Sequence, residues 1–122
     1  MRQIKTVVIV ENEPIIALDL QDRCEEAGFT VLAAARSVAQ AEIKFVDLRP
    51  DVIITNMGIG AGGEGCVIVQ AIRERCPDIS VVFVTATIER SAVERISAMK
   101  PDCVLPKPLP PGGLEEALQA LG

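Results

Sequence analysis

Short runs of apolar, mostly β-branched residues alternate along this chain with segments in which apolar residues recur at helical spacing. Such unbroken runs are typical of strands that are covered on both faces, because neither side of the strand meets water. The runs occupy residues 6–10 (TVVIV), 30–34 (TVLAA), 52–55 (VIIT), 81–84 (VVFV) and 103–105 (CVL). The pattern predicts five strands, each followed by a helix.

The predicted helices carry recognisable start and stop signals. Pro14 opens the first helix at a position where its missing N–H costs nothing, and Gly28 ends it. Ser37 and Gln40 form a capping-box pattern, and Thr87 can cap the fourth helix. The apolar stripes expected to face the sheet are Ile16, Leu20, Cys24 and Ala27; Val38, Ala41, Phe45 and Leu48; Val69, Ile72 and Cys76; Ala92, Ile96 and Met99; and Leu114, Ala117, Leu118 and Leu121.

Five strand–helix units with short connections predict an α/β fold, in which helices cover both faces of a parallel sheet. We expect a flavodoxin-like, doubly wound (βα)5 arrangement with the five strands in the order 2-1-3-4-5. A length of 122 residues suits one domain of common size, so residues 1–122 are expected to form a single domain.

Composition excludes several classes of function. The chain has no His, which rules out Ser-His-Asp and Cys-His catalysis. Twelve Lys and Arg against 17 Asp and Glu give a net charge of −5, which argues against direct nucleic-acid binding, since phosphate contacts need clustered cations. With no Trp, no Tyr and three Phe, a platform for stacking bases or flavins is not expected.

The four cysteines form no CxxC pair, so the sequence gives little support to a zinc site. The N-terminus has no signal-peptide pattern, and the apolar runs are far shorter than the roughly 20 residues that cross a bilayer. We therefore expect a cytoplasmic protein with reduced thiols and no membrane contact. Cys76 and Cys103 are expected to be the most buried cysteines.

Polar residues directly follow four of the predicted strands. In this fold the carboxyl ends of the strands line the binding crevice, so these residues should converge although they are far apart in sequence. They are Glu11, Asn12 and Glu13 after the first strand, Asn56 after the third, Thr85 after the fourth and Lys107 after the fifth. We interpret Glu13 as an acidic residue at a helix N-terminus, where the helix dipole favours a negative charge.

Four segments in this order, VVIVENEP, VIITN with a Gly-rich turn, VVFVTA and VLPKP, resemble the response-regulator receiver domain of two-component signalling. The resemblance spans about residues 6–121. In that family an acidic pair after the first strand holds Mg²⁺, and an aspartate after the third strand accepts a phosphoryl group. A Thr or Ser and a Lys contact that group. The resemblance implies Mg²⁺-ligand positions at Glu11, Asn12 and the Gly58 carbonyl, the phosphoacceptor position at Asn56, and phosphate-contact positions at Thr85 and Lys107. It also implies a cis Lys107–Pro108 bond.

Asn12 and Asn56 depart from the family pattern, because both positions ordinarily carry acids. A carboxamide cannot form an acyl phosphate. Mg²⁺ is usually held by one or two carboxylates together with phosphate oxygens, whereas only Glu11 offers a carboxylate here. We therefore expect no enzymatic activity, no required cofactor and at most weak Mg²⁺ binding.

The resemblance also implies partners: a sensor histidine kinase, a phosphotransfer protein or another regulator, docked on strand 103–105 and the last helices. A second copy of the chain is a further candidate partner. Val104 stands three positions before Lys107, where many receivers carry an aromatic residue. A β-branched side chain has few rotamers, so no aromatic-type rotamer switch is expected at this position.

Two hypotheses account for the asparagines. The chain is a receiver-like module that works without phosphorylation, or it is an ordinary Mg²⁺-dependent receiver inactivated by engineered Asp-to-Asn changes. Both agree with the sequence. A third hypothesis, an enzyme or flavin binder on the same fold, requires a phosphate-binding loop after the first strand. The acidic Glu11-Asn12-Glu13 segment would repel phosphate, and the glycine-rich stretch 58–63 lacks the GK[ST] ending of a P-loop.

Overall fold

The computed structural model describes residues 4–56, 64–86 and 90–121. Within these ranges strands and helices alternate strictly. The strands are β1 (Thr6–Val10), β2 (Thr30–Ala35), β3 (Val52–Thr55), β4 (Ser80–Thr85) and β5 (Cys103–Pro106). The helices are α1 (Pro14–Glu26), α2 (Val38–Lys44), α3 (Glu64–Arg75), α4 (Arg90–Ala98) and α5 (Gly113–Leu121). The predicted strand–helix units are confirmed: β1 and β3 have the predicted bounds, and the other strands run one residue longer at one or both ends.

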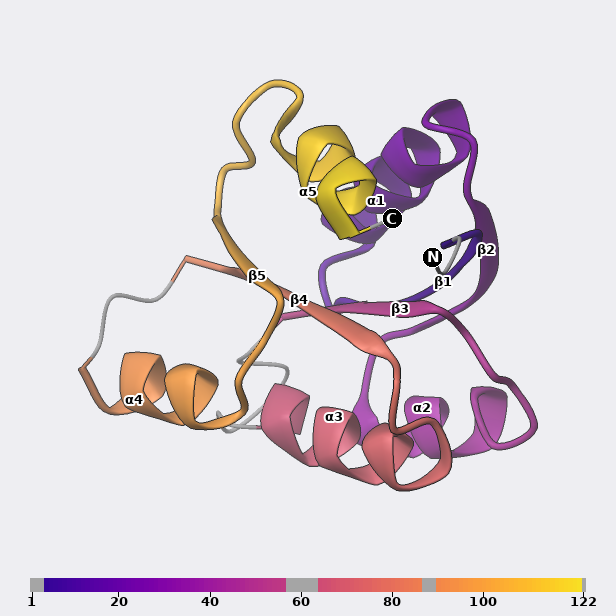
Figure 1. Ribbon diagram of the computed structural model, residues 1–122, viewed down its shortest axis with the longest axis vertical. Coiled ribbons are helices and arrows are strands. Elements are labelled where there is room, and N and C mark those ends of the chain that lie inside the picture. The colour runs from indigo at the N-terminus through magenta and orange to yellow at the C-terminus, as the bar shows by residue number, and fades with distance from the viewer. Residues whose placement is uncertain (1–3, 57–63, 87–89, 122) are drawn as a thin grey trace.

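The five strands form one parallel sheet in the order β2-β1-β3-β4-β5, which confirms the predicted flavodoxin-like topology. Helices α1 and α5 cover one face of the sheet, and α2, α3 and α4 cover the other (Figure 1). The central strands β1, β3 and β4 are therefore covered on both sides, as their unbroken apolar runs predicted. No helix in the described ranges has the length and apolar character needed to span a membrane.

Two hydrophobic layers flank the sheet because successive strand residues point to opposite faces. Val8, Ile53 and Phe83 belong to the layer under α2, α3 and α4, whereas Val7, Ile54 and Val84 belong to the layer under α1 and α5. All six side chains are fully buried. The packing of both layers fixes the strands and so positions the polar residues that follow them.

The helix signals have structural counterparts. Gly28 adopts a left-handed conformation with φ of 94° just after α1, which a residue without Cβ does without strain. The Ser37 Oγ atom accepts a hydrogen bond from the Gln40 N–H at 3.1 Å. The backbone N–H of Arg36 donates to Oε1 of Gln40 at 2.9 Å. In a standard capping box the donor would be the N–H of the N-cap residue, Ser37, one position later. Thr87 lies outside the described residues.

The prediction for the cysteines is wrong: Cys24 is the most buried, and Cys76 and Cys103 are half-buried. Cys24 lies in the last turn of α1 and packs in the layer that α1 shares with α5. Cys76 follows the last residue of α3, and Cys103 opens the edge strand β5, where cover is thinner. Burial, with the nearby Glu115 carboxylate, raises the pKa of Cys24 to about 12. Burial also raises the pKa of Cys66 and of Cys103.

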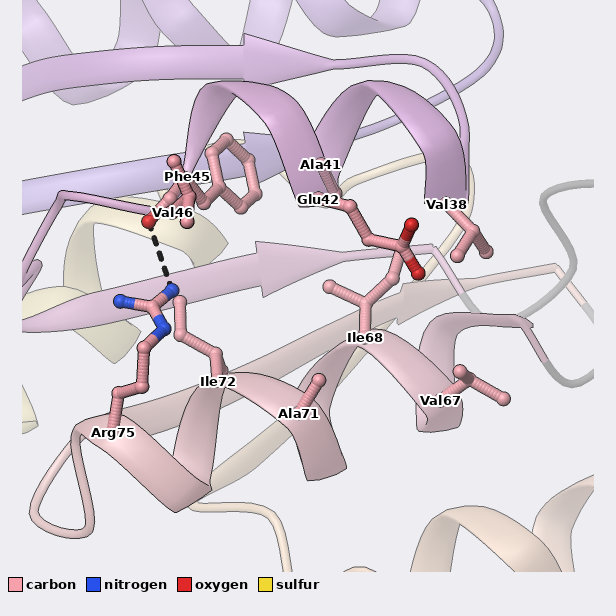
Figure 2. A pocket seen from close by; sticks show the side chains of 10 residues that line it. All are labelled: Val38, Ala41, Glu42, Phe45, Val46, Val67, Ile68, Ala71, Ile72 and Arg75. Carbon is pink, nitrogen blue, oxygen red and sulfur yellow. Dashed lines mark hydrogen bonds between the residues drawn. The ribbon is translucent and has the colours of Figure 1, made fainter.

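Helix α3 is tied to both neighbouring helices by arginines. Just beyond α2, Arg75 donates to the carbonyl oxygen of Phe45 at 2.8 Å (Figure 2). It also donates to the carbonyl oxygen of Leu48 at 2.9 Å. Arg73 donates to the carbonyl oxygens of Met99 and Lys100, just beyond α4. Carbonyl groups at a helix C-terminus have no partner within their helix and carry partial negative charge, so guanidinium groups suit them.

Candidate functional site

The predicted polar residues meet at the carboxyl edge of the sheet, and Glu11 is the buried centre of the group. Its side chain is 0% exposed, directly after β1. The Nζ atom of Lys107 lies 2.5 Å from its Oε1 atom. The backbone N–H of Glu13 donates to its Oε2 atom at 3.0 Å. A carboxylate can be buried at tolerable cost only when it is paired and hydrogen-bonded, and both conditions hold here.

Asn56 contributes a hydrogen-bond donor to this group. Its Nδ2 atom lies 3.4 Å from Oε2 of Glu11 and 3.3 Å from Oδ1 of Asn12. Its backbone N–H donates to the carbonyl of Val10 at 3.0 Å, which extends the β1–β3 pairing by one step. Two oxygen atoms therefore face the Asn56 amide group. An ionised carboxylate at this position would present oxygen to oxygen, with no proton between them.

Thr85 is the last residue of β4, and Lys107 directly follows the neighbouring edge strand β5. The backbone N–H of Lys107 donates to the Thr85 carbonyl at 3.1 Å, so the two residues are adjacent. The Lys107–Pro108 peptide bond is cis, as the resemblance implied. The described structure thus brings together Glu11, Asn12, Asn56 and Lys107, with the half-buried Thr85 beside them. Gly58 lies outside the described residues.

Glu13 has a contact that sequence reasoning missed. It is the N-cap residue of α1, and its side chain makes no capping hydrogen bond. Its Oε2 atom instead lies 3.5 Å from Nζ of Lys107, and the side chain is 60% exposed. Lys107 therefore contacts two carboxylates. The Glu-Asn-Glu spacing after β1 was a signal for this, because the fold brings Lys107 to the same edge.

The described donor set does not fit Mg²⁺. Glu11 is the only carboxylate at the ligand positions implied by the resemblance, and hydrogen bonds already engage both of its oxygens. Across the part of the chain that the structure describes, no three Cys, Asp or Glu side chains are clustered closely enough to hold a metal ion. A hard divalent cation would have to displace Lys107 from Glu11 and then rely on neutral amides.

Two hollows lie on the described surface. One, of about 170 Å³, is an apolar groove between α2 and α3, where Phe45, Ile68 and Ile72 face one another (Figure 2). Its one cationic group, Arg75, is occupied by helix-end carbonyls. The other, of about 410 Å³, lies between α1 and β2, and Glu11, Arg36 and Lys44 are among its lining residues. The convergence of charged and amide groups therefore favours the strand ends as the site.

The family model for the response regulator receiver domain matches residues 7–119. The chain is also similar to the phyllosphere-induced regulator PhyR of Methylorubrum extorquens, with 30% identity over 118 residues. That match covers 94% of this chain and 43% of PhyR, so the chain spans less than half the length of this relative.

Solved structures show the same fold. The receiver domain of a modulated diguanylate cyclase from Desulfovibrio desulfuricans G20 matches with a TM-score of 0.85 and 22% identity, over 97% of this chain and 93% of that one. A CheY-like receiver domain protein from Methanospirillum hungatei JF-1 matches with a TM-score of 0.84 and 18% identity, over 98% and 94%. At these identities the likeness concerns the fold alone.

Proposed function

Since this chain belongs to the response regulator receiver domain family, we propose that it is a signalling module that binds partner proteins without being phosphorylated. One observation carries the proposal. Asn56 stands at the phosphoacceptor position that the resemblance assigns, directly after β3, and its amide group donates to the oxygens of Glu11 and Asn12.

The chemistry of this position supports the proposal. Formation of an aspartyl phosphate needs a carboxylate oxygen as nucleophile, and the Asn56 carboxamide offers none. The nearest carboxylate, Glu11, is fully buried and held by Lys107 and the Glu13 N–H, which makes it a poor substitute. We assign the domain no catalytic activity of its own. In this proposal Glu11, Asn12 and Gly58 bind no metal tightly.

The partner in this proposal is a sensor histidine kinase, a phosphotransfer protein or another regulator. The face formed by α4, β5 and α5 is the proposed docking surface. Val93 on α4 and Val104 on β5 are 46% and 47% exposed, so this face presents apolar area that a partner would cover. Val104 is the residue in this chain at the position where many receivers carry an aromatic side chain.

The test is incubation with acetyl phosphate and Mg²⁺, followed by intact-mass measurement. We expect no stable gain of one phosphoryl group on the unaltered chain. A variant with Asn12→Asp and Asn56→Asp serves as the matched positive control, because it restores the acids of the family pattern. A stable phosphoryl adduct on the unaltered chain that maps to residue 56 or to Glu11 would overturn the proposal.

A further inference from the structure

The ion pair between Lys107 and Glu11 joins residues that follow two strands far apart in the sheet. Glu11 follows β1 and Lys107 follows β5, and both β3 and β4 lie between these strands. Because neighbouring strands lie about 4.8 Å apart, these three intervals amount to roughly 14 Å of sheet. The Nζ atom of Lys107 and the Oε1 atom of Glu11 nevertheless lie 2.5 Å apart, so the two side chains together bridge this separation.

This contact is shielded from water. The Glu11 side chain is 0% exposed and that of Lys107 is 11% exposed. Most ion pairs on protein surfaces contribute little, because water and salt screen them. A pair in this setting interacts more strongly, and removing one partner leaves an uncompensated buried charge.

The charges around this contact balance without a metal ion. Asn12 and Asn56 are neutral, so Glu11 is the one buried negative charge among the described positions of the site, and Lys107 supplies one positive charge. Glu13, 3.5 Å from the ammonium group, is largely exposed and solvated. A divalent cation added to this arrangement would bring surplus positive charge next to Lys107.

We propose that Lys107 is the resident cation of this site. Its ion pair with Glu11 takes the place of a divalent metal and fastens the β5–α5 connection, residues 107–112, to the end of β1. The inference rests on the proposed function, because a receiver that works without phosphate must keep one arrangement without it. The backbone N–H of Lys107 also donates to the carbonyl of Thr85, the last residue of β4, so the backbone of Lys107 is attached to the sheet as well.

Hydrogen–deuterium exchange of the whole chain tests the fastening. Three variants are compared with the unaltered protein: Lys107→Met, Glu11→Gln and the double variant. Lys5→Met, which removes an exposed charge just before β1, is the matched control. We expect each single variant to speed exchange at the amides within residues 104–112, which are those of Val104, Leu105, Lys107, Leu109 and Gly112, by about tenfold or more, because local opening governs exchange there. The control should leave exchange in this segment unchanged.

The double variant makes the result specific to the ion pair. If Lys107 and Glu11 act through each other, the effect of the double change on exchange will be much smaller than the product of the single effects. Glu11→Gln preserves the size of the buried side chain and keeps an oxygen for the Glu13 N–H, so a general folding defect is not expected. Unchanged exchange over residues 104–112 in both single variants, or independent effects in the double variant, would overturn the inference.

Thermal unfolding with and without low-millimolar Mg²⁺ tests the claim that Lys107 replaces a metal. The unaltered chain should show no change in Tm, whereas Lys107→Met should regain part of its lost Tm with Mg²⁺, since Glu11 is then uncompensated. Equal responses of the two proteins would contradict the claim. No phosphodonor is used, so this outcome is independent of the mass measurement that tests the proposed function.

Discussion

The side-chain amide of Asn56 donates a hydrogen bond to the side-chain oxygen of Asn12, with 3.3 Å between the two atoms. These are the two positions at which the chain departs from the acidic pattern of its family. An amide pair can donate on one side and accept on the other, whereas two ionised carboxylates can only accept and repel. The two departures are therefore matched to each other and should be reversed together.

Restoring both acids tests whether the lost chemistry resides in these two residues. Asn12→Asp with Asn56→Asp should recover Mg²⁺ binding and phosphorylation by acetyl phosphate, because Glu11, Thr85 and Lys107 are still in place. Without Mg²⁺ the double variant should lose about 1 kcal/mol of unfolding free energy, since neighbouring carboxylates disfavour joint ionisation. Added metal should restore most of this loss. Denaturant unfolding with and without Mg²⁺, together with intact mass, measures both effects.

The single variant Asn56→Asp is the informative control for that experiment. It should be phosphorylated poorly, because two carboxylates beside Lys107 hold the metal less well than three. If the double variant takes up no phosphate, the defect extends beyond residues 12 and 56. The glycine-rich stretch 58–63 and Val104 would then be the next positions to exchange.

Mg²⁺ should scarcely change the thermal stability of the unaltered chain. The only carboxylate at the expected ligand positions is already held by Lys107 and by the Glu13 N–H. A ligand present at 100 times its Kd adds about 2.7 kcal/mol, so tight binding would be easy to detect. A Tm rise of several degrees in low-millimolar Mg²⁺ would show that the metal positions are assigned wrongly.

The free energy of unfolding should fall as pH rises above about 9, and Cys24 should cause part of the fall. Its ordinary pKa is 9.0 and burial raises it to about 12 in the folded protein. The unfolded chain therefore loses the thiol proton first, so the contribution is complete below pH 9 and is lost as pH rises towards 12. The slope is at most about 1.4 kcal/mol per pH unit. Urea unfolding of the unaltered chain and of Cys24→Ala should give curves that converge at high pH; parallel curves would rule out this role.

Arg75 should matter more for stability than its half-buried position suggests. Arg75→Ala removes hydrogen bonds to the carbonyls of Phe45 and Leu48 and should lower the unfolding free energy by about 1–2 kcal/mol. Arg75→Lys should recover only part, because an ammonium group lacks the planar fork that reaches two carbonyls. Arg90→Ala is the control: its side chain is 93% exposed, and its pair with Glu94 should contribute less than about 0.5 kcal/mol. Equal losses at both positions would contradict the assignment.

The fold could be predicted because its determinants are local. The run at residues 6–10 has no polar side chain pointing to either face except Thr6 at its start, which suits only a strand covered on both sides. The burial of Cys24 could not be predicted in the same way. It depends on where α1 packs against α5. The lower burial of Cys76 depends on where α3 ends, and helix ends are poorly defined by sequence.

The members of the candidate site could be predicted, but their pairing could not. Topology alone places Glu11, Asn56 and Lys107 at one edge of the sheet. Which oxygen Lys107 contacts depends on the torsion angles and the length of two flexible side chains. The spacing of residues in the sequence does not determine these torsion angles. The spacing after β1 places Glu13 at this edge as well, but its contact with Lys107 depends on the same side-chain torsions.

The arginines of α3 set a limit on recombination within this domain. Helix α3 contributes Arg75 to the end of α2 and Arg73 to the end of α4. Consider a chimera that received α3 from a receiver with no arginine at either position. It would lose the hydrogen bonds to the ends of α2 and α4, although the sequences of those two helices were unchanged. The three helices on this face should therefore be exchanged as one block, because a crossover between α2 and α3 or between α3 and α4 would separate a guanidinium group from the carbonyl groups that it contacts.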